Sequence, residues 1–111
     1  MPIFITQARY TQRAIEGLVA KPEDREEEVR KLFERAGCRL LSYYMTLGEY
    51  DFLIIYEAPD ARAVMSVIAV AGAGGGVTDS KTILAVTTAE AKEAFVAANK
   101  SASQFHSAGQ S

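Results

Sequence analysis

The feature that most constrains the fold is a pair of apolar runs in the middle of the chain, joined by a glycine turn. Residues 38–47 and 50–58 are rich in β-branched and aromatic side chains, and Gly48-Glu49 separates them. Such runs predict strands. A two-residue loop that begins with glycine predicts a type II′ hairpin, because glycine adopts the positive φ that this turn requires. The hairpin therefore places two strands side by side in an antiparallel sheet.

A helix is predicted immediately before the hairpin, over residues 21–37. Four apolar side chains recur there at helical spacing: Val29, Leu32, Phe33 and Ala36. Pro22 suits the first helical position, where its missing N–H is not needed. Gly37 is a natural residue at which the helix ends.

A second helix is predicted immediately after the hairpin, with Asp60 as its N-cap. Its expected core face consists of Val64, Met65, Ile68 and Ala69. Further apolar residues occupy much of the rest of its surface, and a helix that is apolar nearly all round is covered on several sides. In a chain of 111 residues a second subunit is a natural source of that cover.

A first and a fourth strand are predicted over residues 2–10 and 77–86, and residues 11–20 form a connection with a short helical turn. Thr87 and Glu90 have the spacing of a capping box, which opens a short helix over about residues 89–99. The Ser/Gly/Gln-rich residues 100–111 are expected to form a flexible tail.

The order is therefore β-α-β-β-α-β with an extra C-terminal helix, which predicts an α+β, ferredoxin-like fold. We expect one domain over residues 1–99, with a four-stranded antiparallel sheet and both main helices on one face. Alternation along the two hairpin strands leaves apolar side chains on both faces of the sheet. A sheet that is apolar on both sides favours a second covering layer, and a second subunit is the simplest source.

Two short segments resemble the GYD domain family. They are Thr46-Leu47-Gly48-Glu49-Tyr50-Asp51 and Glu57-Ala58-Pro59-Asp60, and the opening residues 4–11 also look like the start of that family. This chain has Gly48-Glu49-Tyr50-Asp51 where the family is named for Gly-Tyr-Asp. The resemblance covers about residues 2–96 and implies a ferredoxin-like fold of the dimeric α+β-barrel kind. It transfers no catalytic residues.

The same hairpin is similar to one in the effector-binding domains of Lrp/AsnC regulators. That resemblance is confined to residues 48–51. Those domains share the strand order and assemble side by side to bind small metabolites. The resemblance therefore implies self-association and a small-molecule ligand.

Composition excludes several classes of protein. The net charge of −2 lacks the basic footprint of a general nucleic-acid binder. One Cys and one His exclude an intramolecular disulfide and a metal site built from clusters of these residues, so we expect no metal and no cofactor. The start of the chain lacks the basic and apolar regions of a signal peptide, and no apolar run is long enough to span a bilayer. We therefore expect a cytoplasmic protein that does not contact membranes.

Six residues are candidates for ligand binding because they combine polar groups with places in or beside the predicted strands. They are Arg9, Tyr44, Glu49, Tyr50, Asp51 and Glu57. A tight turn in which Asp51 bonds local backbone is the alternative for the loop residues. Packing is the alternative for the tyrosines, and surface salt bridges for the charged residues. An interior Arg9 paired with Asp79 or Glu57 would be a candidate for acid–base chemistry or carboxylate binding.

Three functions are consistent with these features. The leading hypothesis is a homo-oligomeric module, without enzymatic activity, that binds a small molecule at an intersubunit or sheet-face pocket. The second is an enzyme without a cofactor, an isomerase or monooxygenase, with Tyr44, Arg9, Asp51 and Glu57 as carriers of its chemistry. The third is a protein-interaction subunit of a larger assembly. A closed apolar cavity with converging polar groups favours the first two, and an exposed apolar patch favours the third.

Overall fold

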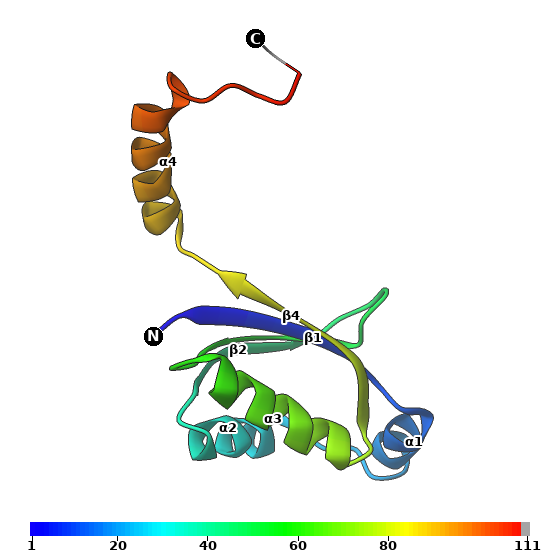
Figure 1. Ribbon diagram of the computed structural model, residues 1–111. Helices are drawn as coiled ribbons and strands as arrows, with labels where there is room; N and C mark the ends of the chain where they lie inside the picture. The colour runs from blue at the N-terminus through cyan, green and yellow to red at the C-terminus, as the bar shows by residue number, and fades with distance from the viewer. Residues whose placement is uncertain (110–111) are drawn as a thin grey trace.

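The computed structural model describes residues 1–109 and has the predicted α+β architecture (Figure 1). In chain order the elements are β1 (Ile3–Tyr10), α1 (Gln12–Ala20), α2 (Glu26–Arg35), β2 (Arg39–Met45), β3 (Phe52–Glu57), α3 (Ala61–Ala73), β4 (Val77–Ala85) and α4 (Thr88–Ala102). The strands form one antiparallel sheet in the order β2-β3-β1-β4. The ferredoxin-like prediction is confirmed.

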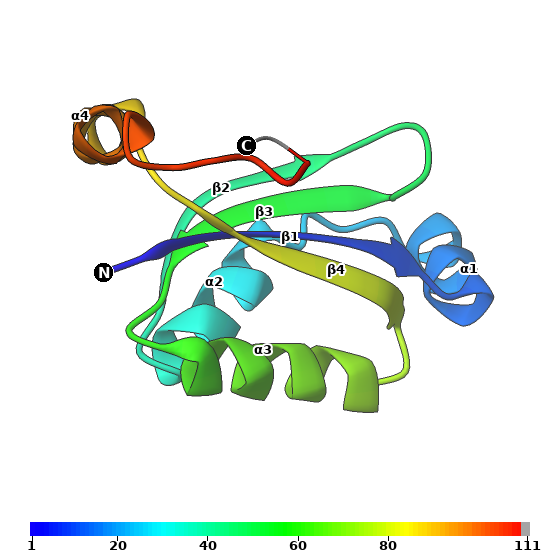
Figure 2. The same ribbon diagram turned by 45° about the horizontal axis from the view of Figure 1, so that its top comes forward.

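The core lies between one face of the sheet and the helices α2 and α3 (Figure 2). Tyr56 is fully buried at its centre, and the ring of Phe33 meets it edge-on with 4.6 Å between centroids. The Tyr56 hydroxyl shares a 2.8 Å hydrogen bond with the hydroxyl of Thr6, which in turn lies 2.8 Å from that of Thr82. The hydroxyl inside the core therefore has a partner, as a buried polar group requires.

The helices before the hairpin differ from the prediction. Residues 12–20 form a full helix, α1, because the Thr11 side chain accepts the N–H of Ala14 and caps its start. The prediction of one helix from residue 21, with Pro22 at its first position, is wrong, because α2 begins only at Glu26. The Asp24 carboxylate accepts the Glu26 N–H at 2.9 Å, which forms a turn before the helix.

The predicted hairpin is confirmed, but the prediction that its turn has two residues is wrong. The strands pair only as far as Met45 and Phe52. The Thr46 N–H donates to the Asp51 carbonyl at 2.9 Å, and the Thr46 hydroxyl donates to the Tyr50 carbonyl at 2.8 Å. These bonds close a longer loop over residues 47–50, and Gly48 supplies the positive φ, of 117°, inside it.

Helix α3 begins where predicted, with a different buried face. The Asp60 carboxylate accepts the Ala63 N–H at 2.9 Å, so the predicted cap is confirmed. The buried side chains are Val64 and Val67, while Met65 is exposed. Of the predicted face, Val64 and Ile68 pack on the core, whereas Met65 does not, so the buried face is turned by about a quarter of a turn. Met65 and Val70 remain exposed.

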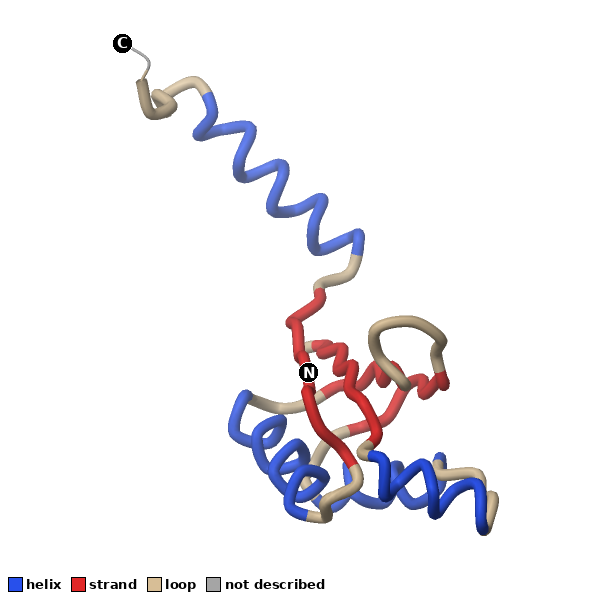
Figure 3. Tube along the Cα trace, turned by 90° about the vertical axis from the view of Figure 1, so that its right-hand side faces the viewer, coloured by secondary structure: helices blue, strands red, loops and turns tan. Residues whose placement is uncertain are grey.

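The C-terminal helix α4 stands away from the rest of the molecule (Figures 1 and 3). The capping box of Thr87 and Glu90 that opens it is confirmed. The helix continues to Ala102, three residues beyond the predicted end, and the last two residues of the predicted tail lie outside the described part of the chain. The division at residue 99 stays a prediction. None of the helices within residues 1–109 is long and apolar enough to cross a membrane.

Candidate functional site

The open face of the sheet carries a row of three isoleucines. Ile5 lies opposite Ile55 on β3 and opposite Ile83 on β4, so the three side chains sit side by side. Helices α2 and α3 pack on the other face of the sheet (Figure 2), and α4 stands away from it (Figures 1 and 3). Ile83 remains 49% exposed. The prediction that both faces of the sheet are apolar is therefore confirmed.

Arg9 lies at the end of this face nearest the hairpin loop. Its Nε donates to the Glu49 carbonyl at 2.7 Å, and its guanidinium lies 5.6 Å from the centroid of the Tyr50 ring. Its two ion pairs, to Glu49 and Asp79, are both 3.8 Å long, and its side chain is 44% exposed. Exposed pairs of this length contribute little to stability. The Arg9 guanidinium thus steadies the loop and keeps N–H donors facing solvent.

Asp51 ties the hairpin loop to the end of β1. Its Oδ2 accepts the Tyr10 N–H at 2.8 Å, and its own N–H donates to the Ala8 carbonyl at 2.9 Å. These bonds join residues about forty positions apart, so they are not the local turn bonds that the alternative interpretation expected. Beside them the pairing of β1 with β4 shifts register between Gln7 and Arg9. The Asp51 carboxylate therefore fixes the end of β1, beside the point where the pairing of β1 with β4 becomes irregular.

The structure brings four of the six candidates together and separates the other two. Arg9, Glu49, Tyr50 and Asp51 meet at the loop. Tyr44, 62% exposed, lies on the open face opposite Leu53 of β3. Glu57 lies at the far end of β3, where it pairs with Arg39 at 3.4 Å.

Arg9, Glu49 and Glu57 form salt bridges, as one of the alternatives predicted. Arg9 pairs with Asp79, but the two side chains are 44% and 60% exposed. Arg9 is therefore not the interior residue that acid–base chemistry required. The ligand-binding role of the six residues stays a prediction.

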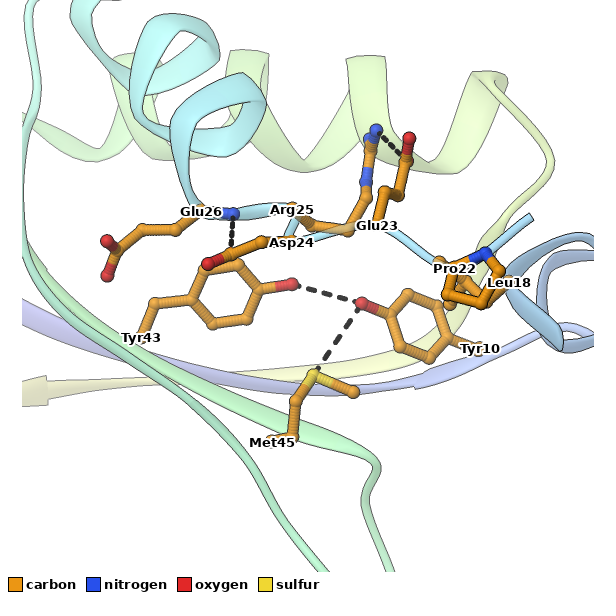
Figure 4. Close-up of a pocket in the computed structure, with 9 residues that line it drawn as sticks. All are labelled: Tyr10, Leu18, Pro22, Glu23, Asp24, Arg25, Glu26, Tyr43 and Met45. Atoms are coloured by element: carbon orange, nitrogen blue, oxygen red, sulfur yellow. Dashed lines mark hydrogen bonds and ion pairs between the residues drawn. The ribbon is translucent and has the colours of Figure 1, made fainter.

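A pocket opens on the helix side of the sheet, and none of the six candidate residues lines it. It is lined by Tyr10, Leu18, Tyr43 and Met45 and by residues 22–26 (Figure 4). The two tyrosine hydroxyls point toward each other with 3.0 Å between oxygens, and the Tyr10 hydroxyl lies 3.9 Å from the Met45 sulfur. A tyrosine on each of two strands, both with rings facing the helices, is the only sequence signal for it.

Burial changes the acidity of the Tyr43 hydroxyl. Desolvation raises the pKa of Tyr43 above the usual tyrosine range, and the hydrogen bond with Tyr10 acts in the same direction. Desolvation also raises the pKa of Tyr56. Both groups therefore stay protonated in the folded protein at neutral pH, and Tyr43 acts as a hydrogen-bond partner rather than as a base.

We expect the free energy of unfolding to fall as the pH rises above about 10, the ordinary tyrosine pKa. There the unfolded chain loses phenolic protons that the folded chain keeps, so stability present below that pH is lost above it. Urea unfolding at about pH 9 and about pH 11 measures the fall. The fall should be smaller in Tyr43→Phe and unchanged in Tyr44→Phe. If the free energy of unfolding fell equally in both variants, burial of the Tyr43 hydroxyl would not be the cause of the pH dependence.

The single cysteine belongs to the core. Cys38 is buried, and burial raises the pKa of its thiol, with the Asp60 carboxylate adding to the effect. A thiol with a raised pKa forms little thiolate and reacts slowly. Within residues 1–109 no group of three His, Cys, Asp or Glu side chains is arranged to hold a metal ion.

Comparison with known proteins gives one family and one curated relative. The model of the GYD domain matches residues 4–95. A protein of Thermus thermophilus described as a glutamine synthetase and cystathionine beta-lyase binding protein is 39% identical over 64 residues. The match covers 58% of this chain and 67% of that protein.

Two solved structures have a similar fold. A transcriptional regulator from Neisseria meningitidis, in complex with L-Met, matches with a TM-score of 0.53 and 20% identity over 78% of this chain. The protein MtbAldR matches with a TM-score of 0.53 and 11% identity over 78% of this chain. This chain spans about half the length of each, 50% and 52%. These similarities show a shared fold.

Proposed function

Because this chain belongs to the GYD domain family, we propose that it is a self-associating module that binds a small carboxylate. In this proposal the open sheet face packs against a second copy of the chain. The ligand binds beside Arg9, at the rim of the interface. The fold shared with a regulator crystallised with L-Met, an amino acid, is consistent with a carboxylate ligand.

The row of Ile5, Ile55 and Ile83 is the observation that carries the proposal. Ile83 is 49% exposed and Ile5 and Ile55 are partly exposed, so covering the apolar area that the row leaves to solvent favours association. A second copy supplies the same row, and two identical faces related by a two-fold axis are self-complementary.

Helix α4 gives the second copy a further apolar surface. It stands clear of the sheet, and Phe95 is 71% exposed on it. Ala91 and Ala98 lie on the same side of the helix as Phe95, four and three residues away. An isolated helix of this length is marginal in water and gains most of its stability from packing. We therefore expect α4 to pack against a partner subunit.

Arg9 is the residue best suited to recognise a carboxylate. A guanidinium binds a carboxylate through two parallel N–H bonds. Within residues 1–109 the one hydrogen bond from the Arg9 guanidinium comes from Nε, while the ion pairs from its two terminal nitrogens are 3.8 Å long. A ligand carboxylate that approaches within 3 Å would replace these long pairs with charge-assisted hydrogen bonds.

We expect at least one amino acid at millimolar concentration to raise the melting temperature of the protein. Ligand that binds only the folded state stabilises it, by about 1.4 kcal/mol at ten times its dissociation constant, which is several degrees for a domain of this size. A thermal-shift titration with the standard amino acids measures this. Arg9→Gln should lose the shift. The carboxylate proposal fails if no amino acid shifts the parent protein, or if Arg9→Gln shifts equally.

A protein-interaction subunit is the second candidate function, and the Thermus relative favours it. That relative is described as binding two enzymes, and this chain exposes apolar side chains on α4 and on the outer side of α3. Size-exclusion chromatography with purified glutamine synthetase separates the two candidates. Co-elution supports the interaction subunit, whereas elution of the chain alone as an oligomer supports the self-associating module.

A further inference from the structure

Two helices of this chain, α1 and α4, contain no buried residue. On α1 the side chains of Ile15 and Val19 lie one turn apart and are 43% and 75% exposed. On α4 the Phe95 side chain is 71% exposed, with alanines on the same side of the helix. A short helix gains most of its stability by packing its apolar face. Within residues 1–109 the apolar faces of both helices are left open to solvent.

The two helices lie at opposite corners of the molecule (Figure 1). Helix α4 follows the end of β4, where Ala85 pairs with Ile3 at the start of β1. Helix α1 follows the end of β1, where Tyr10 pairs with Val77 at the start of β4. The two helices are therefore at opposite ends of one strand pair. Helix α1 also lies on the helix side of the sheet, whereas α4 rises from the open side (Figure 1).

We propose that α4 of each copy packs its apolar face against α1 of a second copy. This inference rests on the proposed association of the open sheet faces. The two-fold axis in this arrangement lies between the two sheets, perpendicular to the strands. Rotation about it exchanges the ends of the strands and the two sides of the sheet, so it brings α1 of the second copy to the corner where α4 stands. The dimer then contains this contact twice, as two-fold symmetry requires.

The length of α4 is sufficient for this contact. Its 15 residues span about 22 Å, and sheets that pack face to face lie about 10 Å apart. Because β4 is an edge strand, α4 leaves the sheet at its margin and can pass beside the second sheet. It then reaches the helix layer of the second copy, where α1 lies.

The charged residues beside the two apolar faces are complementary. Lys92 lies one turn before Phe95 on α4, and Glu16 lies one turn before Val19 on α1. Both side chains are exposed, and neither forms an ion pair within residues 1–109. Opposite charges at a contact favour the matching surface over other partners. Contact between two copies of α4 would instead bring two lysines together, so α1 is the better partner.

An engineered disulfide tests the contact, with Phe95→Cys and Val19→Cys in the same full-length chain. Both side chains are largely exposed, so these substitutions have little effect on the fold. A disulfide requires Cα atoms about 4.4–6.8 Å apart. Because the two helices lie at opposite corners of one chain, this bond can form only between chains, and the native Cys38 is buried. After treatment with oxidised glutathione we expect a linked dimer as the main species on a non-reducing gel.

Val96→Cys combined with Val19→Cys is the matched control, because Val96 is 52% exposed but points about 100° away from Phe95 around the helix. This control and Phe95→Cys alone should give no linked dimer. Ile15→Cys in place of Val19→Cys tests the neighbouring turn of α1.

The outcomes separate this contact from self-association itself. The α4–α1 contact is overturned if the Val96 control links equally, or if Phe95→Cys links alone, since α4 then meets α4. It is also overturned if the parent protein is an oligomer but neither α1 position links to Phe95→Cys. A parent protein that is a monomer in native mass spectrometry overturns the proposed self-association as well.

Discussion

Ile83→Glu should convert the protein from an oligomer to a monomer. The side chain is 49% exposed in the single chain, so its replacement has little effect on the fold, but it lies in the row that we expect to face a second copy. Burying an unpaired carboxylate at an interface costs several kcal/mol. We therefore expect the dissociation constant of the assembly to rise at least about a hundredfold. Light scattering coupled to size-exclusion chromatography measures the change in mass.

Met65→Glu is the matched control for this substitution. Met65 is also a large apolar side chain, 70% exposed, but it lies on α3 in the helix layer, away from the open sheet face. The Met65→Glu protein should keep the mass of the parent. If both variants dissociate, the effect comes from added charge in general. If neither does, the isoleucine row is not the interface.

Asp51→Ala should lower the free energy of unfolding by about 1–3 kcal/mol, the cost of leaving a partly buried donor without its acceptor. The lost acceptor is the carboxylate oxygen 2.8 Å from the Tyr10 N–H. Asp51→Asn keeps an oxygen at that position, so it should recover part of the loss. Urea unfolding measures the change, with the midpoint falling and the slope unaffected.

Glu49→Ala is the control for the Asp51 substitution. The Glu49 side chain contributes only an exposed 3.8 Å ion pair to Arg9, because the shorter bond uses the Glu49 carbonyl. We expect its stability to stay within about 0.5 kcal/mol of the parent. An Asp51→Ala protein as stable as Glu49→Ala would show that the loop does not depend on the Asp51 carboxylate.

The parts of the fold that were predictable from the sequence are those set by local patterns. The hairpin follows from two apolar runs around a glycine. The caps at Asp60 and Thr87 follow from short polar side chains just before helices. The unexpected helix α1 has the same kind of signal in Thr11, which accepts the Ala14 N–H. It could therefore have been predicted by the same rule.

The contacts that build the candidate sites join residues far apart in the chain. Asp51 meets Tyr10 across 41 positions, and Tyr10 meets Tyr43 across 33. No local pattern specifies such pairs, because they depend on strand order and register. A register shift between Leu40 and Ser42 also decides which residues of β2 share a face, and alternation counted along the sequence does not reveal it.

The central claim is that the open sheet face joins copies of this chain. The most direct test is native mass spectrometry of the unmodified protein at micromolar concentration, which gives the mass of the assembly and of any bound small molecule. The account predicts a mass of at least twice the 12.0 kDa of one chain. A protein that remains a single 12.0 kDa chain under these conditions would contradict it.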